Sequence, residues 1–233
     1  MKLSNKILLS IFVLIFASIV TMMVTVRLDI GDVKAAIKEE PETFEIPVEP
    51  FESVTIEKNA RIILIEGDSY GLKVIGHKLE AVNLNISTQV NAGNLEFKFP
   101  ENYGKERHRH KIQLTTPKVK KIILKDNARL TVRTLDQDSL KIDLSDQAEL
   151  TAKEIAVDYL AVKATSQTRL RSNNCMIKQV AVILKDKSEC ALFNLDGASI
   201  TGTLEEHSLL QLSGWTAKLN VDLDKKARII KRD

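Results

Sequence analysis

The chain has 233 residues, of which 44% are hydrophobic and 28% are charged, enough for one folded domain and a short attachment. A formal net charge of +3 with only 5% aromatic residues argues against nucleic acid as a partner, because neither a strong positive field nor a basic stripe with interleaved aromatic residues is present. The two cysteines and four histidines show no metal-binding spacing, so we expect no cofactor.

The N-terminal residues 1–27 have the composition of a membrane anchor. No charged residue occurs from Ile7 to Val26, and a helix of this length spans about 30 Å, the thickness of a hydrocarbon core. Lys2 and Lys6 precede this run and favour a cytoplasmic N-terminus. A cleaved secretory signal begins similarly, but its apolar region is shorter and ends in small residues. We therefore expect an uncleaved single-pass helix in the lipid bilayer, and under either alternative the rest of the chain is exported.

The exported part of the chain consists of segments that differ in how regularly their sequence patterns repeat. Residues 28–43 are charged and lack a period, which indicates a linker. We assign residues 44–233 to one β-domain outside the cytoplasm, in the periplasm or at the cell surface. Its irregular first part, 44–119, consists of short alternating runs separated by turns, which are typical of strands. Within it, the sequence KNARI at 58–62 echoes DNARL at 126–130 and predicts an early coil of the same kind.

A sequence pattern repeats every twenty residues in the second part of the domain, 120–233. Steps of twenty separate Ala128, Ala148, Thr168, Ser188 and Ser208, and the last step, to Ala227, is one residue shorter. Such a period predicts a stacked repeat in which each unit buries its apolar face on its neighbours. Three short alternating strands per twenty residues fit one circuit of a parallel β-helix. Its inward columns include Leu140, Leu160, Val180, Ile200; Leu130, Leu150, Leu170, Cys190, Leu210; and Leu135, Ile155, Cys175, Leu195, Trp215. The single tryptophan is therefore expected to be mostly buried.

Two further columns describe the corner of each coil. The small residues from Ala128 to Ser208 follow a turn, where a larger side chain would collide with the next coil. Asp126, Asp146 and Asp186 precede them and suit turns. A calcium-binding row is the alternative, but the glycine-rich signature of calcium-binding repeats is absent.

The outward column beside this corner alternates in charge. It reads Arg129, Glu149, Arg169, Glu189, Leu209 and Arg228. Strands of adjacent coils lie about 4.8 Å apart, so opposite charges meet at each step. The column predicts coils that stack in parallel and in register. Cys175 and Cys190 fall in different inward columns, and we expect free buried thiols rather than the alternative disulfide.

The densest polar cluster lies at residues 104–111. We interpret six of its residues as a possible anionic-ligand patch: Lys105, Arg107, His108, Arg109, His110 and Lys111. Such a patch could contact lipid headgroups or surface polysaccharide. A solvated basic loop is the alternative, and a metal site would require a third ligand besides the two histidines.

The serial coils resemble the putative auto-transporter adhesin, head GIN domain family of bacterial envelope proteins. The resemblance rests on FESVTI at 51–56, NLEFKF at 94–99, TPKVKKI at 116–122 and the LSDQAEL-like coils, and it covers roughly residues 51–230. It implies a right-handed parallel β-helix, an envelope location and no catalytic residues. The corners lack the glycine that members often carry.

Two functions fit this sequence. The first is a membrane-anchored, non-catalytic envelope module for adhesion or for binding a glycan or envelope protein. The alternative is a polysaccharide lyase or hydrolase, which needs two carboxylates about 5–10 Å apart in a cleft. No spaced catalytic set is visible, so we expect a protein that is not an enzyme.

Overall fold

The structure is a computed structural model that describes residues 18, 21–22, 42–76, 87–99 and 111–232. The chain forms two compact units, residues 1–41 and 42–233. The predicted membrane helix from Ile7 to Val26 lies outside the described residues, apart from Ser18, Thr21 and Met22. Within the described part of the chain, no helix is long and apolar enough to cross a membrane.

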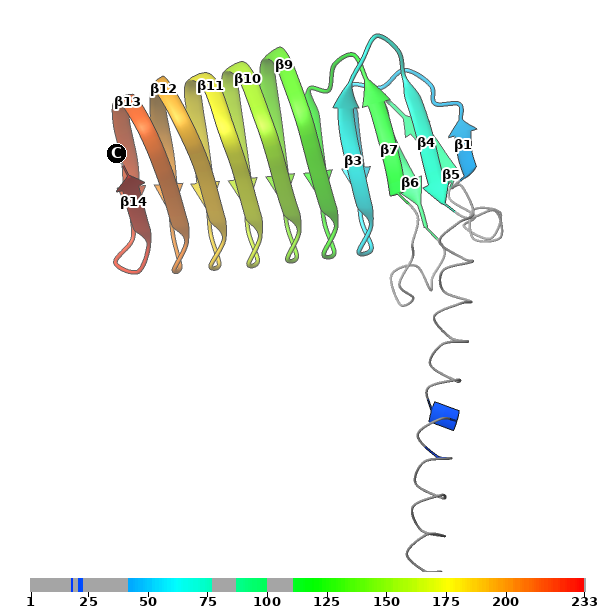
Figure 1. Cartoon of the computed structure of the whole chain (residues 1–233). Coiled ribbons are helices and arrows are strands. Elements are labelled where there is room, and N and C mark those ends of the chain that lie inside the picture. The colour runs from blue at the N-terminus through cyan, green and yellow to red at the C-terminus, as the bar shows by residue number, and fades with distance from the viewer. Residues whose placement is uncertain (1–17, 19–20, 23–41, 77–86, 100–110, 233) are drawn as a thin grey trace, which may run out of the picture. The chain divides into compact units, whose positions relative to one another are not determined.

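The second unit is built from strands (Figure 1). In chain order they are β1 (Glu42–Ile46), β2 (Ser53–Ile56), β3 (Arg61–Glu66), β4 (Gly71–Gly76), β5 (Ser87–Asn91), β6 (Asn94–Lys98), β7 (Lys111–Thr116), β8 (Lys121–Leu124), β9 (Arg129–Leu144), β10 (Glu149–Ala164), β11 (Arg169–Leu184), β12 (Glu189–Leu204), β13 (Leu209–Leu223) and β14 (Arg228–Arg232). The strands pair in the order β1-β4-β7-β3-β9-β10-β11-β12-β13-β14, with β2, β5, β6 and β8 paired off this path, and the all-β prediction is correct for the described residues of this unit.

Coils β9 to β12 stack in register, twenty residues apart. Each is a strand of 16 residues, and the neighbouring strands are parallel. Leu150 pairs with Leu130 on one side and with Leu170 on the other. This contiguous inner row confirms the predicted β-solenoid with coils of about twenty residues.

The predicted three short strands per coil are joined into one bent strand. In β9, Val132 and Leu135 are both buried, and the two residues between them are exposed. A second exposed pair, Asp138 and Ser139, precedes buried Leu140. Two consecutive outward residues break the period of two, so the backbone bends there. The pairing with β10 resumes after each bend, and the strand therefore continues through the coil.

Each coil closes through a tight turn with two left-handed residues. Asp126 and Asn127 have φ of 51° and 60°, and the Ala128 N–H donates to the Lys125 carbonyl at 3.0 Å. Positive φ at both central residues defines a type I′ turn, which favours asparagine and aspartate. The same φ pair recurs at residues 58–59, 146–147, 166–167, 186–187 and 206–207. The polar residues at these corners are therefore selected by turn geometry, as predicted.

The small residues that follow the turns are buried. Ala128, Ala148 and Ser188 have no exposed surface, and Thr168 and Ser208 are 1% exposed. Ser188 Oγ donates to the Ala164 carbonyl at 3.0 Å. The hydroxyls of Thr168 and Ser208 have no hydrogen-bond partner among the described residues. The column is thus a tightly packed corner of the core.

The early coil predicted from the echo at residues 58–62 is also present. Arg61 pairs with Arg129, and Ile62 pairs with Leu130, across 68 positions of sequence. The Asn59 N–H donates to the Asp126 carbonyl at 2.8 Å, as successive turns do later in the solenoid. On its other side β3 pairs in parallel with β7, beyond which β4 and β1 are antiparallel.

The prediction that Trp215 is buried is wrong, because its side chain is 64% exposed. Leu212 pairs with Leu192, twenty positions apart, whereas Gly214 pairs with Leu195, nineteen positions apart. The one-residue shortening therefore precedes Trp215. Gly214 takes the inward position that Trp215 was expected to fill, and a one-residue slip turns a side chain to the opposite face.

The two cysteines are free and buried. Burial raises the pKa of both thiols, and charge repulsion between them adds to the rise at Cys190. The predicted buried free thiols are confirmed, and the alternative disulfide is not formed.

Candidate functional site

From β9 to β12 the outward charge column forms a regular ladder of ion pairs. Glu149 contacts Arg129 at 3.3 Å and Arg169 at 3.7 Å, and Arg169 Nε contacts Glu189 at 3.2 Å. These contacts confirm the predicted alternation across β9 to β12. Each is partly exposed, so it contributes modestly to stability but strongly constrains the register.

The alternation fails at the start of the column. On β7, β3 and β9 the successive outward residues are Lys111, Arg61 and Arg129, three cations side by side. Among the ion pairs between described residues, Arg129 contacts Glu149, and neither Arg61 nor Lys111 takes part in one. Like charges on facing strand positions oppose pairing. The excess positive charge of these three side chains therefore favours the binding of an anion.

A pocket of about 290 Å³ lies at these three cations. It is lined by Arg61, Ile62, Ile63, Lys111, Arg129 and Thr131. Arginine presents a planar fork that matches carboxylate, sulfate or phosphate groups, and lysine adds a compact positive charge. We call Lys111, Arg61 and Arg129 the cationic column. It has the chemistry of an anion-binding surface.

Only one residue of the predicted basic patch falls within the described part of the chain. Lys111 is exposed at the start of β7, and Lys105, Arg107, His108, Arg109 and His110 lie outside the described residues. The patch therefore stays a prediction, and the structure adds Arg61 and Arg129 beside its last residue. No group of three metal-binding side chains occurs among the residues that the structure describes.

A second, longer groove of about 700 Å³ crosses the coils at their bends. It is lined by Lys118, Asp136, Gln137, Asp138, Ala156, Val157, Asp158, Met176, Ile177, Lys178 and Asp196. Lys178 contacts Asp158 at 2.7 Å. The Gln137 side chain is fixed by bonds to both the carbonyl and the N–H of Val119, at 2.7 and 3.1 Å.

Exposed Trp215 continues the line of this groove onto the last coil. It pairs in register with Asp196, one of the groove residues. A Cβ on Gly197 would lie 2.9 Å from the indole, so the ring packs directly on this glycine. Sequence analysis missed this exposed aromatic residue, and the signal that could have revealed it is Gly214, where the repeat shortens.

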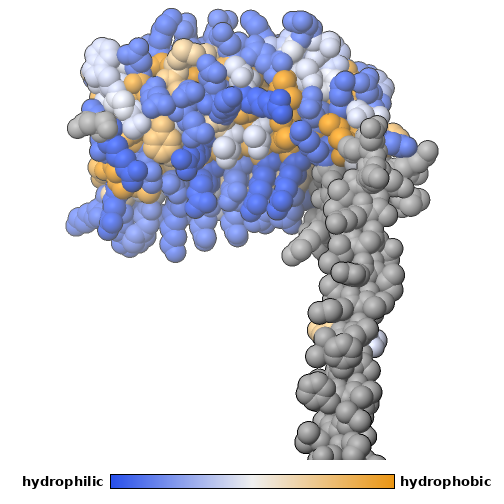
Figure 2. Space-filling model, viewed as in Figure 1, coloured by the Kyte–Doolittle hydropathy of each residue, from blue (hydrophilic) through white to orange (hydrophobic). Residues whose placement is uncertain are grey.

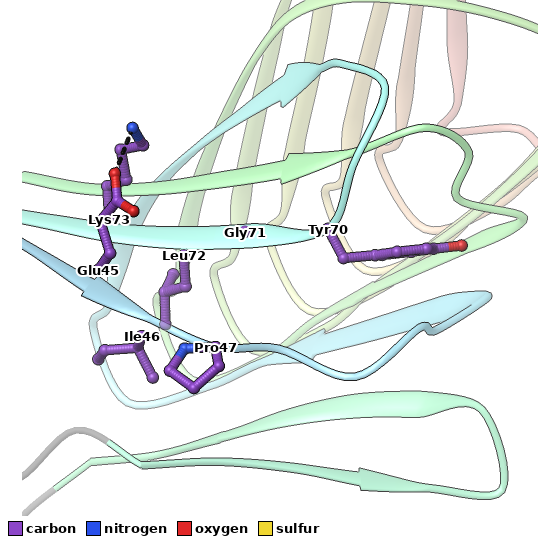
Figure 3. Close-up of a pocket in the computed structure, with 7 residues that line it drawn as sticks. All are labelled: Glu45, Ile46, Pro47, Tyr70, Gly71, Leu72 and Lys73. Atoms are coloured by element: carbon purple, nitrogen blue, oxygen red, sulfur yellow. Dashed lines mark ion pairs between the residues drawn. The ribbon is translucent and has the colours of Figure 1, made fainter.

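A small pocket of about 330 Å³ lies between β1 and β4 (Figure 3). Ile46, Pro47 and Leu72 lie together on one side, while Tyr70 extends away from them. Lys73 and Glu45 form an ion pair of 2.6 Å at the rim. Because both rim charges are satisfied by each other, this pocket lacks the excess positive charge of the cationic column.

Asp186 and Glu206 are carboxylates in the turns of neighbouring coils, and they repel each other. A hydrogen bond to Asp186 and its negative charge raise the pKa of Glu206, which lies on the next coil. By contrast, N–H groups of Glu206, Lys226 and Ala227 hold the pKa of Asp224 below its usual value. These acids shape the turns, and Lys185 and Lys226 offset part of their negative charge.

Comparisons with known proteins agree with this architecture. The family model described as putative auto-transporter adhesin, head GIN domain matches residues 50–233. A putative adhesin from Bacteroides fragilis NCTC 9343 is similar in structure, with a TM-score of 0.62 and 14% identity over 84% of this chain and 98% of that protein. A putative lipid binding protein from Parabacteroides distasonis ATCC 8503 matches with a TM-score of 0.50 and 14% identity over the same shares. No curated protein matches the chain. The chain belongs to the putative auto-transporter adhesin, head GIN domain family.

Proposed function

We propose that this protein is a non-catalytic, adhesin-like envelope module that binds anionic groups at the cationic column. Its solenoid is exported and is held at the membrane by the anchor from Ile7 to Val26. The ligand is a carboxylate, sulfate or phosphate group carried by an envelope glycan or by a lipid headgroup. Membership in a family described as a putative auto-transporter adhesin supports this assignment.

One observation carries the proposal. The outward column alternates in charge from Arg129 to Glu189 but presents three cations at Lys111, Arg61 and Arg129. An acid at position 61 would continue the ladder and pair with both neighbours. A bound anion supplies the same missing charge, and charge-assisted hydrogen bonds to it are stronger than neutral ones.

The predicted basic patch extends this surface in the sequence. Lys111 is shared by the two, because it ends the patch of residues 105–111 and lines the pocket with Arg61. In the sequence, the other cations of the patch directly precede Lys111. Contacts between an anion and such cations raise both affinity and association rate, and they weaken as salt increases.

Binding of the full chain to two anionic probes tests the proposal. The probes are dextran sulfate and vesicles that contain phosphatidylglycerol, with neutral dextran and phosphatidylcholine vesicles as controls. We expect binding to at least one anionic probe, and Arg61→Ala should weaken it about tenfold, equivalent to about 1.4 kcal/mol. The matched control is Arg169→Ala, which removes the same charge from a paired position of the same column.

The outcomes separate the two sources of the anion. Loss of dextran sulfate binding alone identifies a glycan, and loss of vesicle binding alone identifies a lipid surface; the structural neighbour described as a putative lipid binding protein motivates the second arm. Equal effects of Arg61→Ala and Arg169→Ala would show that net charge, rather than the cationic column, governs binding.

A second function, polysaccharide cleavage, is favoured by one specific observation. The long groove combines several aspartates, among them Asp136 and Asp138, with exposed Trp215 beyond its end. Glycoside hydrolysis uses two carboxylates that flank the scissile bond. Incubating the full chain with envelope polysaccharide and measuring new reducing ends distinguishes the functions: release that is abolished by Asp136→Asn supports cleavage, and binding without release supports the first proposal.

A further inference from the structure

The C-terminal end of the solenoid exposes residues that belong to the core. Leu219 and Leu223 occupy the inward positions of Ile200 and Leu204 in register. They are 40% and 49% exposed, whereas Ile200 and Leu204 have no exposed surface. The difference arises because this part of β13 has a neighbouring strand on one side only among the described residues. Its apolar edge is built like an interior face but is open to solvent.

The strand edge at this place is also unpaired. β14 pairs with Leu209–Ser213, the first part of β13. Among the described residues, no strand pairs with residues 218–223 on the side away from β12. An open edge with free N–H and C=O groups is a template for an added strand. Leu219, Val221 and Leu223 supply alternate apolar positions along it.

The chain segment that contains this edge is strongly basic. Residues 216–232 contain six cations, Lys218, Lys225, Lys226, Arg228, Lys231 and Arg232, against two acids. One of these acids, Asp224, accepts hydrogen bonds from the N–H groups of Lys226 and Ala227 in the last turn and of Glu206 in the turn before it. Figure 2 shows hydrophobic surface at the β13–β14 end beside hydrophilic surface. The end therefore combines apolar side chains with a cationic rim.

We propose that this end binds an extended, acidic segment of a partner polypeptide, which adds to β13 as the next strand of the solenoid. Apolar residues at alternate positions of the partner cover Leu219, Val221 and Leu223, and its acidic residues face the lysines and arginines. A second copy of this chain is disfavoured, because end-to-end stacking would bring two cationic rims together. The surface is separate from the cationic column, so either proposal can fail alone.

Binding of synthetic peptides to the full chain tests this inference. The probe alternates valine and glutamate, and the controls alternate valine with lysine and serine with glutamate. We expect the valine–glutamate peptide to bind and to slow hydrogen exchange at residues 218–223, and neither control to do so. The double variant Leu219→Ser, Leu223→Ser should weaken binding about tenfold or more. Both side chains are already exposed, and far-UV circular dichroism checks that the variant folds.

A second double variant separates charge from apolar contact. Lys225→Glu with Lys226→Glu should weaken the valine–glutamate peptide and allow the valine–lysine peptide to bind. Trp215→Ala is the matched control and should leave binding unchanged, because Trp215 lies in the outward line of the groove. Absence of peptide binding overturns the proposal. Protection of residues 218–223 that depends on protein concentration without peptide also overturns it, since the end would then be a self-association surface.

Discussion

Reversing the charge of Arg61 should stabilise the fold while removing the proposed activity. In Arg61→Glu, the new carboxylate lies between Lys111 and Arg129, so the column alternates through its first three positions. Two like-charge contacts are replaced by two opposite-charge contacts. Each opposite pair on facing strands contributes roughly 0.2–1 kcal/mol, and exposure places these pairs toward the lower end. We expect a gain of about 1 kcal/mol, which raises the melting temperature of a domain of this size by about 2–4 °C.

Thermal unfolding followed by far-UV circular dichroism measures this gain, and dextran sulfate or phosphatidylglycerol vesicles measure the accompanying loss of binding. Arg61→Gln removes the repulsion without adding a carboxylate and should give about half the stabilisation. High salt should shrink the difference between the variants. A melting temperature for Arg61→Glu at or below that of the natural chain would refute the assignment of the column. Stabilisation without loss of binding would place the anion site elsewhere.

Three further changes have defined outcomes. Asp186 repels the ionised Glu206 carboxylate and raises its pKa in the folded state, so stability is lost as the pH rises through that pKa. Glu206→Gln should therefore melt at a higher temperature than the natural chain at pH 7. The difference in melting temperature should vanish below about pH 4, where Glu206 is protonated in both the folded and the unfolded state. Ser208→Ala removes a buried hydroxyl that has no partner among the residues the structure describes, in a column that elsewhere holds alanine. Urea titration should show stabilisation by about 1 kcal/mol, and destabilisation would mean that the hydroxyl has a partner. Trp215 is the only tryptophan, and acrylamide should quench its fluorescence efficiently, whereas strong resistance to quenching would restore the buried assignment.

The repeat frame made most of the solenoid predictable from sequence. Residues twenty apart, such as Leu130 and Leu150, share a column because the step is constant, and the charge alternation at Arg129 and Glu149 follows from the same frame. The prediction failed at Trp215 because the repeat step changes there from twenty residues to nineteen. The sequence reveals that the last repeat is one residue shorter, but it does not reveal where in the repeat the residue is missing. Gly214, with φ of 88° and a Cβ position 2.4 Å from the Leu195 carbonyl oxygen, marks that position.

The cationic column was only partly accessible to sequence reasoning. The echo of KNARI in DNARL places Arg61 beside Arg129, and the structure confirms this juxtaposition across 68 positions. No repeated frame connects Lys111 to Arg61, because β7 pairs with β3 in the irregular part of the domain. The three cations therefore became a group only when the order of the first strands was known.

The juxtaposition of Arg61 and Arg129 underlies both the early coil and the proposed anion site, and a designed disulfide measures it directly. Facing residues on adjacent strands lie at about the Cα separation that a disulfide requires. Full-chain Arg61→Cys, Arg129→Cys should form an intramolecular bond on mild oxidation, detectable by peptide mass spectrometry, while buried Cys175 and Cys190 remain thiols. The control Arg61→Cys, Glu149→Cys places the thiols one coil further apart and should stay reduced. Failure of the first pair to bridge, or equal bridging of both pairs, would contradict the account.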